Sequence, residues 1–80
     1  MKHCITLAQP QFADIESTKK SFQAIRNERN FKVGDTVFFQ EHNGTGLTGK
    51  EEARIITYIL DDHKILRTGY VVLGIKEVEG

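Results

Sequence analysis

The sequence predicts a mixed α+β fold: a small β-barrel of about five strands with one short N-terminal helix. Several short segments are rich in β-branched and aromatic residues, as strands are. One segment after Pro10 places Phe12 and Ile15 at helical spacing. Many short strands in a small chain favour a barrel or a strongly bent sheet, because closure removes exposed strand edges. The 80 residues are expected to form a single domain, residues 1–80.

The expected elements follow from periodicity. The first strand covers residues 3–7, whose alternation places three side chains on one face: His3, Ile5 and Leu7. Pro10 fits the start of the helix, which is expected to end around residues 17–19. The remaining strands are expected at residues 22–26, 36–41, 53–60 and 70–78.

Glycine and asparagine mark the turns between these strands. Gly34 supplies backbone freedom for a tight turn, in which Asp35 is expected to bond neighbouring amides. Residues 42–49 are predicted to be a loop with an Asn-Gly hairpin turn. Its glycines do not match a phosphate-binding loop and are interpreted as a mobile lip over a groove: Gly44, Gly46 and Gly49. Residues 65–68 are expected to be a helical turn or a loop.

Composition excludes several classes of function. Eleven basic and eleven acidic side chains cancel, so any attraction to nucleic acid must be local. The single cysteine, Cys4, rules out an internal disulfide and a cysteine-based zinc site, and it is expected to be a small buried side chain. The spacing of His3, His42 and His63 matches no metal-ligand pattern. No apolar stretch approaches the length that spans a bilayer, so a cytoplasmic location without membrane contact is expected.

One local charge excess stands out. Residues 19–33 carry five cations and one acid before the Gly34-Asp35 turn. We call its cations the cationic strip: Lys19, Lys20, Arg26, Arg29 and Lys32. Such a strip is either a solvated face, partly paired with Glu28 and Asp35, or a place for an anion.

Segments along nearly the whole chain resemble the ASCH domain, a member of the PUA-like group of small β-barrels. The resemblance is to a short branch found in phages and bacteria whose function is largely uncharacterised. It is carried by residues 20–22, 27–35, 48–50, 57–60 and 69–75, with His3 and Ile5 similar to the opening strand. The resemblance implies a PUA-like barrel with a cleft between helix and barrel that takes RNA or a nucleotide.

This chain departs from the family pattern beside Lys20. The family has Gly two residues before that lysine, then Lys-Thr-x-Glu-x-Arg or a Thr in place of the Glu. Here Thr18, Gln23 and Ile25 stand at the Gly, Glu and Arg positions, and an arginine follows as Arg26. Either a bulge shifts the local register, or the strip has lost part of that chemistry.

The favoured function is an RNA- or nucleotide-binding module with a cationic cleft, working by phosphate neutralisation and base stacking without a metal or a cofactor. The expected ligand-binding residues are Lys19, Lys20, Gln23, Arg26, Asn27 and Arg29. Asn27 is equally expected to be a turn residue, and Arg29 could instead pair with Asp35.

Two alternatives stay open. The resemblance implies that Lys20 could be the catalytic group of a small amidohydrolase acting on an acylated cytidine. Gln23 is a poor proton carrier, and Ser21 is expected on the face opposite Lys20. A helper acid would then come from the second half of the chain, from Glu51, Glu52, Asp61 or Asp62. The other alternative is a phage-type protein-interaction domain with a vestigial cleft.

The aromatic residues are mostly assigned to the core. Tyr58 and Tyr70 could stack on a base, but both lie in apolar strands and are expected to be core or half-core. The phenylalanines expected to be mostly buried are Phe22, Phe31, Phe38 and Phe39, with either Phe38 or Phe39 outward or under the helix.

Overall fold

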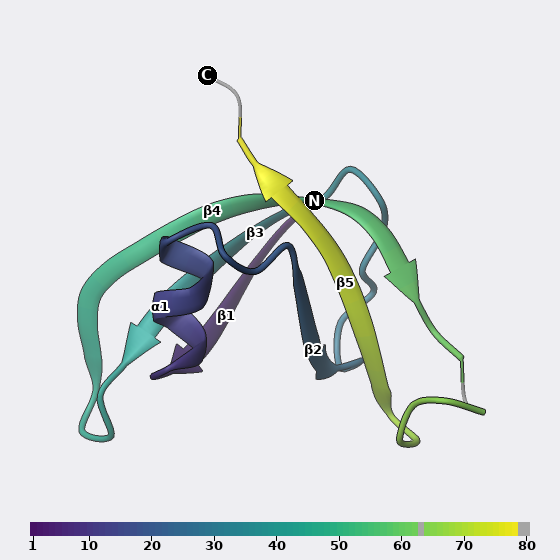
Figure 1. Cartoon of the computed structure of the whole chain (residues 1–80), viewed down its shortest axis with the longest axis horizontal. Coiled ribbons are helices and arrows are strands. Elements are labelled where there is room, and N and C mark those ends of the chain that lie inside the picture. Colours follow the sequence, from purple (N-terminus) through teal and green to yellow (C-terminus); the bar gives the residue numbers. More distant parts are fainter. Residues whose placement is uncertain (63, 79–80) are drawn as a thin grey trace.

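The computed structural model of the chain describes residues 1–62 and 64–78, which form one five-stranded sheet and one short helix. The elements are β1 (Lys2–Ala8), α1 (Gln11–Glu16), β2 (Phe22–Arg26), β3 (Thr36–His42), β4 (Leu47–Leu60) and β5 (Tyr70–Glu77). Figure 1 shows the sheet curled into a half-barrel with α1 on its concave side. The prediction of about five strands and one short N-terminal helix is confirmed.

The order of the strands leaves the barrel open along one side. The sheet runs β1-β3-β4-β5-β2, with β1 parallel to β3 and every other pair antiparallel. The curl turns the two outer strands, β1 and β2, toward each other, and residues of both line a hollow of about 210 Å³. Residues 27–35 connect the end of β2 to β3.

Helix α1 covers the concave face. Phe12 and Ile15 are fully buried, and the helix has only six residues, so packing holds it rather than intrinsic propensity. Pro10 caps its start and Ser17 its end, close to the predicted limits. The core between α1 and the sheet contains Ile5, Leu7, Phe12, Ile15, Phe31, Val37, Phe39, Ile56, Val71, Leu73 and Ile75.

Alternation predicts the face correctly in β1 and β3. The side chains of His3, Ile5 and Leu7 are buried, as expected. In β3, Phe39 is buried and its neighbour Phe38 faces outward, half-buried. Cys4 is exposed, not buried, because it lies on the outward face of β1.

The hairpin between β3 and β4 is tighter than predicted. Asn43 Oδ1 accepts hydrogen bonds from the backbone amides of Thr45 and Gly46, and β4 begins at Leu47. The predicted loop therefore shrinks to a short turn, and the predicted strand gains an extension that pairs Gln40 with Glu51. The extension is polar and largely exposed, so it lacks the apolar alternation that identifies a strand.

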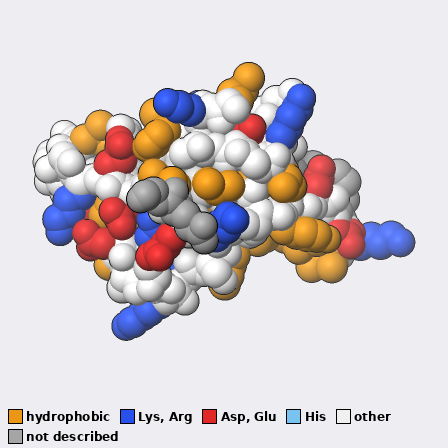
Figure 2. All heavy atoms as spheres, turned by 90° about the horizontal axis from the view of Figure 1, so that it is seen from above, with side chains coloured by type: hydrophobic (Ala, Val, Ile, Leu, Met, Phe, Trp, Pro, Cys, Tyr) orange, Lys and Arg blue, Asp and Glu red, His pale blue; other side chains and the backbone are white. Residues whose placement is uncertain are grey.

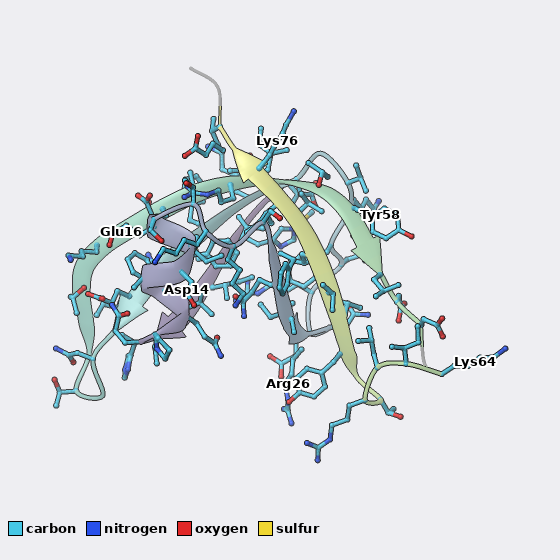
Figure 3. The ribbon with its side chains drawn as sticks, in the orientation of Figure 1. Asp14, Glu16, Arg26, Tyr58, Lys64 and Lys76 are labelled. Carbon is cyan, nitrogen blue, oxygen red and sulfur yellow. The ribbon has the colours of Figure 1, made fainter. Side chains whose placement is uncertain are left out.

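A β-bulge in the middle of β4 changes which side chains point outward. Ile56 pairs with Ile75, but the next partners are Tyr58 and Gly74, so Thr57 is the extra residue. A one-residue shift moves every following side chain to the other face. Tyr58 is consequently 63% exposed, which corrects its expected core position, and Figure 3 shows it pointing away from α1. The predicted core position of Phe22 is also wrong, because it starts β2 on the outward face and is 54% exposed.

Candidate functional site

The cationic strip follows the length of β2 and does not gather at one point. Lys20 precedes β2 and Arg26 ends it, six residues later, a span of about 20 Å in an extended chain. The neighbouring strand β5 runs the opposite way, and Figure 3 shows Lys76 and Arg26 at opposite ends of the molecule. On the face seen in Figure 2, Lys and Arg side chains stand singly rather than as a continuous patch.

Lys20 lines a cleft of about 400 Å³, which we call the Lys20 cleft. The residues around it come from the linker after α1, from β4 and from the end of β5: Thr18, Lys20, Ser21, Arg54, Ile75, Lys76 and Glu77. Its volume falls in the range typical of small-molecule sites. Three cations face one acid there, so the charge of its lining favours an anion.

The Lys20 side chain is held in place by Gln23. The half-buried lysine donates from Nζ to Gln23 Oε1 at 2.7 Å. Gln23 is buried, and its Nε2 donates to Gln11 Oε1 at 3.2 Å and to the Ala24 carbonyl at 3.0 Å. This chain of hydrogen bonds joins the linker, β2 and α1. Gln23 was expected to bind ligand, but its contacts make it the residue that orients Lys20.

Arg54 forms the rear of the Lys20 cleft and also holds α1. Its guanidinium donates to the Ile15 carbonyl at 2.7 Å, to the Ala53 carbonyl at 2.8 Å and to Glu52 at 3.4 Å. Only 6% of the residue is exposed. A buried cation at the C-terminal end of a helix satisfies a free carbonyl and complements the helix dipole.

The residues that complete the cleft are hard to identify from the sequence alone. Arg54 lies within an apolar strand, and Lys76 and Glu77 lie far from Lys20 in the chain. Ser21 lines the same cleft as Lys20, contrary to expectation, because strand alternation starts only at Phe22. The signal that could have found Lys76 and Glu77 is the antiparallel pairing of β2 with β5, which brings the start of β2 to the end of β5.

Three of the predicted ligand-binding residues lie at or beyond the far end of β2: Arg26, Asn27 and Arg29. Arg26 faces outward, and Ile25 packs against the core, since β2 pairs with β5 in an unbroken register. A bulge in β2 is therefore excluded. The Arg26 guanidinium lies 6.0 Å from the centre of the Tyr70 ring and donates to Glu28 at 3.3 Å. Hydrogen bonding to Tyr70 and to Glu28 raises the pKa of Arg26 above its ordinary value.

Asn27, Arg29 and Lys19 are exposed and lie outside the Lys20 cleft. The Asn27 backbone amide donates to the Gly69 carbonyl at 2.8 Å, which joins the loop after β2 to the loop before β5. Arg29 and Arg26 line the hollow between β1 and β2, while Arg26 and Asn27 line one of about 240 Å³ beside Tyr70. Both hollows are smaller than typical ligand sites.

Asp35 contacts His3 and the turn before β3, not Arg29, with which an ion pair was considered. Its carboxylate lies 2.9 Å from His3 Nε2 and accepts the Lys32 backbone amide at 3.1 Å, so it bonds neighbouring amides as predicted and does not pair with Arg29. The hydrogen bond with His3 is the main reason that the pKa of Asp35 falls to about 2. His3 also stacks on Phe31, with ring centres 4.7 Å apart. These contacts secure the start of β1 against the turn before β3.

The acids proposed as helpers for Lys20 lie elsewhere. Glu51 accepts from Gln40, Glu52 pairs with Arg54, and Asp62 accepts from the Lys64 backbone amide. Asp61 follows β4 and is not part of the lining of the Lys20 cleft. Glu77 is the acidic residue in that lining.

A second polar cluster lies at the β3–β4 hairpin. Glu41 accepts hydrogen bonds from Thr48 Oγ1 at 2.7 Å and from Gln9 Nε2, and these contacts lower its pKa, with Thr48 the larger cause. A hollow of about 450 Å³ lies nearby, lined by Ala8, Gln9, His42, Asn43 and Gly44. No Lys or Arg side chain is in its lining, so this hollow lacks the positive charge that favours an anion at the Lys20 cleft.

Within 1–62 and 64–78, no group of three or more His, Cys, Asp or Glu side chains is placed to hold a metal ion. His63, considered with the other histidines, lies outside the described residues. No helix in the described part of the chain is long and apolar enough to cross a membrane.

Comparison with known proteins gives a match to one family model. A search of curated proteins found no match. A family model described as a domain of unknown function, DUF3850, matches residues 2–75. The match includes all of α1, β2, β3 and β4 and the lining of the Lys20 cleft up to Ile75. Because it spans most of the sequence, the chain belongs to the DUF3850 family.

Proposed function

We propose that this protein is an RNA- or nucleotide-binding module whose Lys20 cleft takes a phosphate-bearing part of the ligand. The observation that carries the proposal is the cleft itself: Lys20, Arg54 and Lys76 surround about 400 Å³ of open volume. The Lys20 ammonium has three N–H donors and gives one to Gln23, which leaves two for phosphate oxygens. Gln23 orients these donors before the ligand arrives, which reduces the entropy cost of binding.

The resemblance to ASCH domains supports the same proposal. The lysine that carries the resemblance, Lys20, is the one that lines the cleft. A half-barrel with a short helix on its concave side is compatible with a PUA-like fold, and we propose that relationship for this chain. Thr18 stands at the family's Gly position, and its positive φ of 61° is the backbone conformation that glycine adopts most easily.

Amide hydrolysis of an acylated cytidine is the second candidate, favoured by the presence of Glu77 in the same cleft as Lys20. Lys20 would be the reactive amine and Glu77 the proton carrier. We place this activity below binding, because the group that contacts Lys20 is the neutral amide of Gln23, which does not exchange protons at neutral pH.

The binding proposal is tested by calorimetric titration of the protein with cytidine 5′-monophosphate. Lys20→Met removes the charge but keeps most of the apolar stem, and we expect affinity to fall by about tenfold or more, the usual effect of losing a hydrogen bond to a charged group. The matched control is Lys19→Met, the neighbouring exposed cation, for which we expect a change of less than about threefold. Wild-type affinity should also fall as salt rises. Equal losses in both variants, or affinity that is indifferent to salt, would contradict the proposal.

The hydrolase candidate is tested separately by incubating the protein with N4-acetylcytidine and measuring release of cytidine. Turnover that disappears in both Lys20→Ala and Glu77→Gln, with the fold intact by circular dichroism, would establish hydrolysis. Absence of turnover in the wild-type protein removes this candidate and leaves the binding proposal untouched.

A further inference from the structure

The outer face of the sheet, which points away from α1, presents three rows of side chains across β2, β5 and β4. The pairing of the strands gives the rows directly: Phe22–Gly74–Tyr58, then Ala24–Val72–Leu60, then Arg26–Tyr70. Each row member lies on the outward side, since the alternate residues Gln23, Leu73 and Ile59 are buried or pack against the core. We call these rows the outer aromatic face.

The first row leaves two aromatic rings exposed on either side of a glycine. Phe22 is 54% exposed and Tyr58 is 63% exposed, and their backbones are about 10 Å apart, two strand spacings. Gly74 between them has no side chain to fill the space. The β4 bulge brings Tyr58 to this position, and a Cβ on Gly74 would lie 3.0 Å from Thr57 Oγ1 and 3.2 Å from the Tyr58 Cβ.

Cations lie near two of the aromatic rings on this face, Phe22 and Tyr70. Lys20 Nζ lies 5.7 Å from the centre of the Phe22 ring, and the Arg26 guanidinium lies 6.0 Å from the centre of the Tyr70 ring. Lys76 is outward on β5, two residues beyond Gly74. All residues of the three rows belong to the described part of the chain, and none of them is acidic.

We propose that the outer aromatic face binds single-stranded nucleic acid. Exposed rings on a sheet surface offer stacking partners for successive bases, and the cations beside Phe22 and Tyr70 can neutralise the adjoining phosphates. This complementarity of charge and stacking selects nucleic acid over an uncharged apolar partner, for which flanking cations would be of no use. The surface shares Lys20 and Lys76 with the Lys20 cleft, but its aromatic rings lie outside the lining of that cleft, so the proposal stands whether or not the cleft binds a nucleotide.

The test is the affinity of the full chain for fluorescein-labelled octauridylate, measured by fluorescence anisotropy. We expect Phe22→Ala and Tyr58→Ala each to weaken binding by between about fivefold and 150-fold, the range for losing one base–aromatic stack. Phe22→Tyr and Tyr58→Phe keep a ring and should bind within about twofold of wild type. Leu47→Ala, which trims another exposed apolar side chain of β4, is the matched control and should leave binding unchanged.

Amide NMR spectra of the same titration separate this proposal from the cleft proposal. Shifts at Ala24, Tyr58 and Gly74 support binding on the outer aromatic face. Shifts confined to Thr18, Ser21 and Arg54 would overturn it while leaving the cleft proposal standing. Absence of octauridylate binding would overturn it, as would alanine variants that bind as well as wild type. A dimer that Tyr58→Ala dissociates would also overturn it, by showing that a second copy covers the face.

Discussion

Thr18 is the one non-glycine residue with a positive φ in the part of the chain that the structure describes. Its φ is 61°, in the left-handed region, where a β-branched residue is rare. It follows α1 directly, donates its amide to the Ile15 carbonyl at 3.1 Å and lines the Lys20 cleft. The strain therefore lies in the linker that positions Lys20.

Replacing Thr18 with glycine should stabilise the protein. The left-handed conformation costs an L-residue about 1–2 kcal/mol, which glycine avoids, although glycine loses more entropy on folding. We expect Thr18→Gly to raise the free energy of unfolding by about 1 kcal/mol, measured by urea denaturation. Ser17→Gly is the control, because the Ser17 φ of −80° gives glycine no advantage. A Thr18→Gly variant less stable than wild type would contradict the inference that Thr18 is strained in the folded protein.

Asp35 predicts a specific dependence of stability on pH. Its pKa in the folded protein is about 2, below the ordinary 3.8, so the ionised form favours folding. That contribution is complete above the ordinary pKa and is lost as pH falls from about 4 to about 2. We expect Asp35→Asn to have a lower Tm at neutral pH, and the difference from wild type to shrink across this window. If the Tm values of wild type and Asp35→Asn differ by the same amount from neutral pH down to pH 2, ionised Asp35 does not stabilise the fold.

Single residues were predicted well where one local rule governs them. Asp35 bonds a neighbouring amide, as its turn position indicated, and His3 lies on the inward face that alternation gave it. Tyr58 was misplaced because the bulge at the preceding residue, Thr57, decides its face, and an extra residue in a strand leaves no mark on local composition. Phe22 was misplaced because its hydrophobicity was taken as a sign of burial, whereas its strand position faces outward.

At the scale of elements, the bulged pair β4–β5 depends on a glycine. Gly74 faces Tyr58 across the strands, and the space for a Cβ is taken by Thr57 and Tyr58. The Thr57 hydroxyl can rotate away, but the Tyr58 Cβ at 3.2 Å cannot move without its strand. The bulge at Thr57 therefore requires a residue without a side chain at position 74.

Gly74→Ala should accordingly destabilise the protein by about 1–3 kcal/mol, the usual cost of overpacking, measured by urea denaturation. Gly46→Ala is the control: an added Cβ there meets no atom within 4 Å, and we expect a change of about 0.5 kcal/mol or less. Equal stabilities of the two variants would show that β4 adjusts freely at the bulge.

Helix α1 depends on Arg54 as well as on its two buried side chains. The Arg54 guanidinium donates to the Ile15 carbonyl at 2.7 Å, and Arg54→Met would leave that carbonyl with only the longer hydrogen bond from the Thr18 amide, at 3.1 Å. We expect the free energy of unfolding to fall by about 2 kcal/mol, as for other hydrogen bonds to charged groups. Lys50→Met, at an exposed cation of the same strand, should change it by about 0.5 kcal/mol or less. An Arg54→Met variant with the same free energy of unfolding as wild type would mean that packing alone holds the end of α1.

Elements with strong apolar patterns were predictable, and polar ones were not. The limits of β1, β3 and β5 lie close to those that alternation and β-branched content gave. The first part of β4, from Leu47 to Glu52, is polar because it extends the hairpin into solvent, so only its pairing with β3 reveals it as a strand.

At the scale of the whole molecule, the curl of the sheet decides which residues meet. Lys20 was identified from the sequence, but its partners Arg54 and Lys76 reach it only through the order β4-β5-β2. The same topology separates Lys20 from Arg26 and Arg29, which the sequence had grouped as one strip. The local charge excess in the sequence therefore identified Lys20, whereas Arg54 and Lys76 can be identified only from the order of the strands.

The most direct test of the central claim is an amide NMR titration with cytidine 5′-monophosphate, which is too small to cross the outer aromatic face. We expect saturable shifts of the amides that line the cleft, and their loss in Lys20→Met; the residues are Thr18, Lys20, Ser21, Arg54 and Lys76. Shifts elsewhere, or none up to high nucleotide concentration, would contradict the assignment of the Lys20 cleft as a nucleotide site.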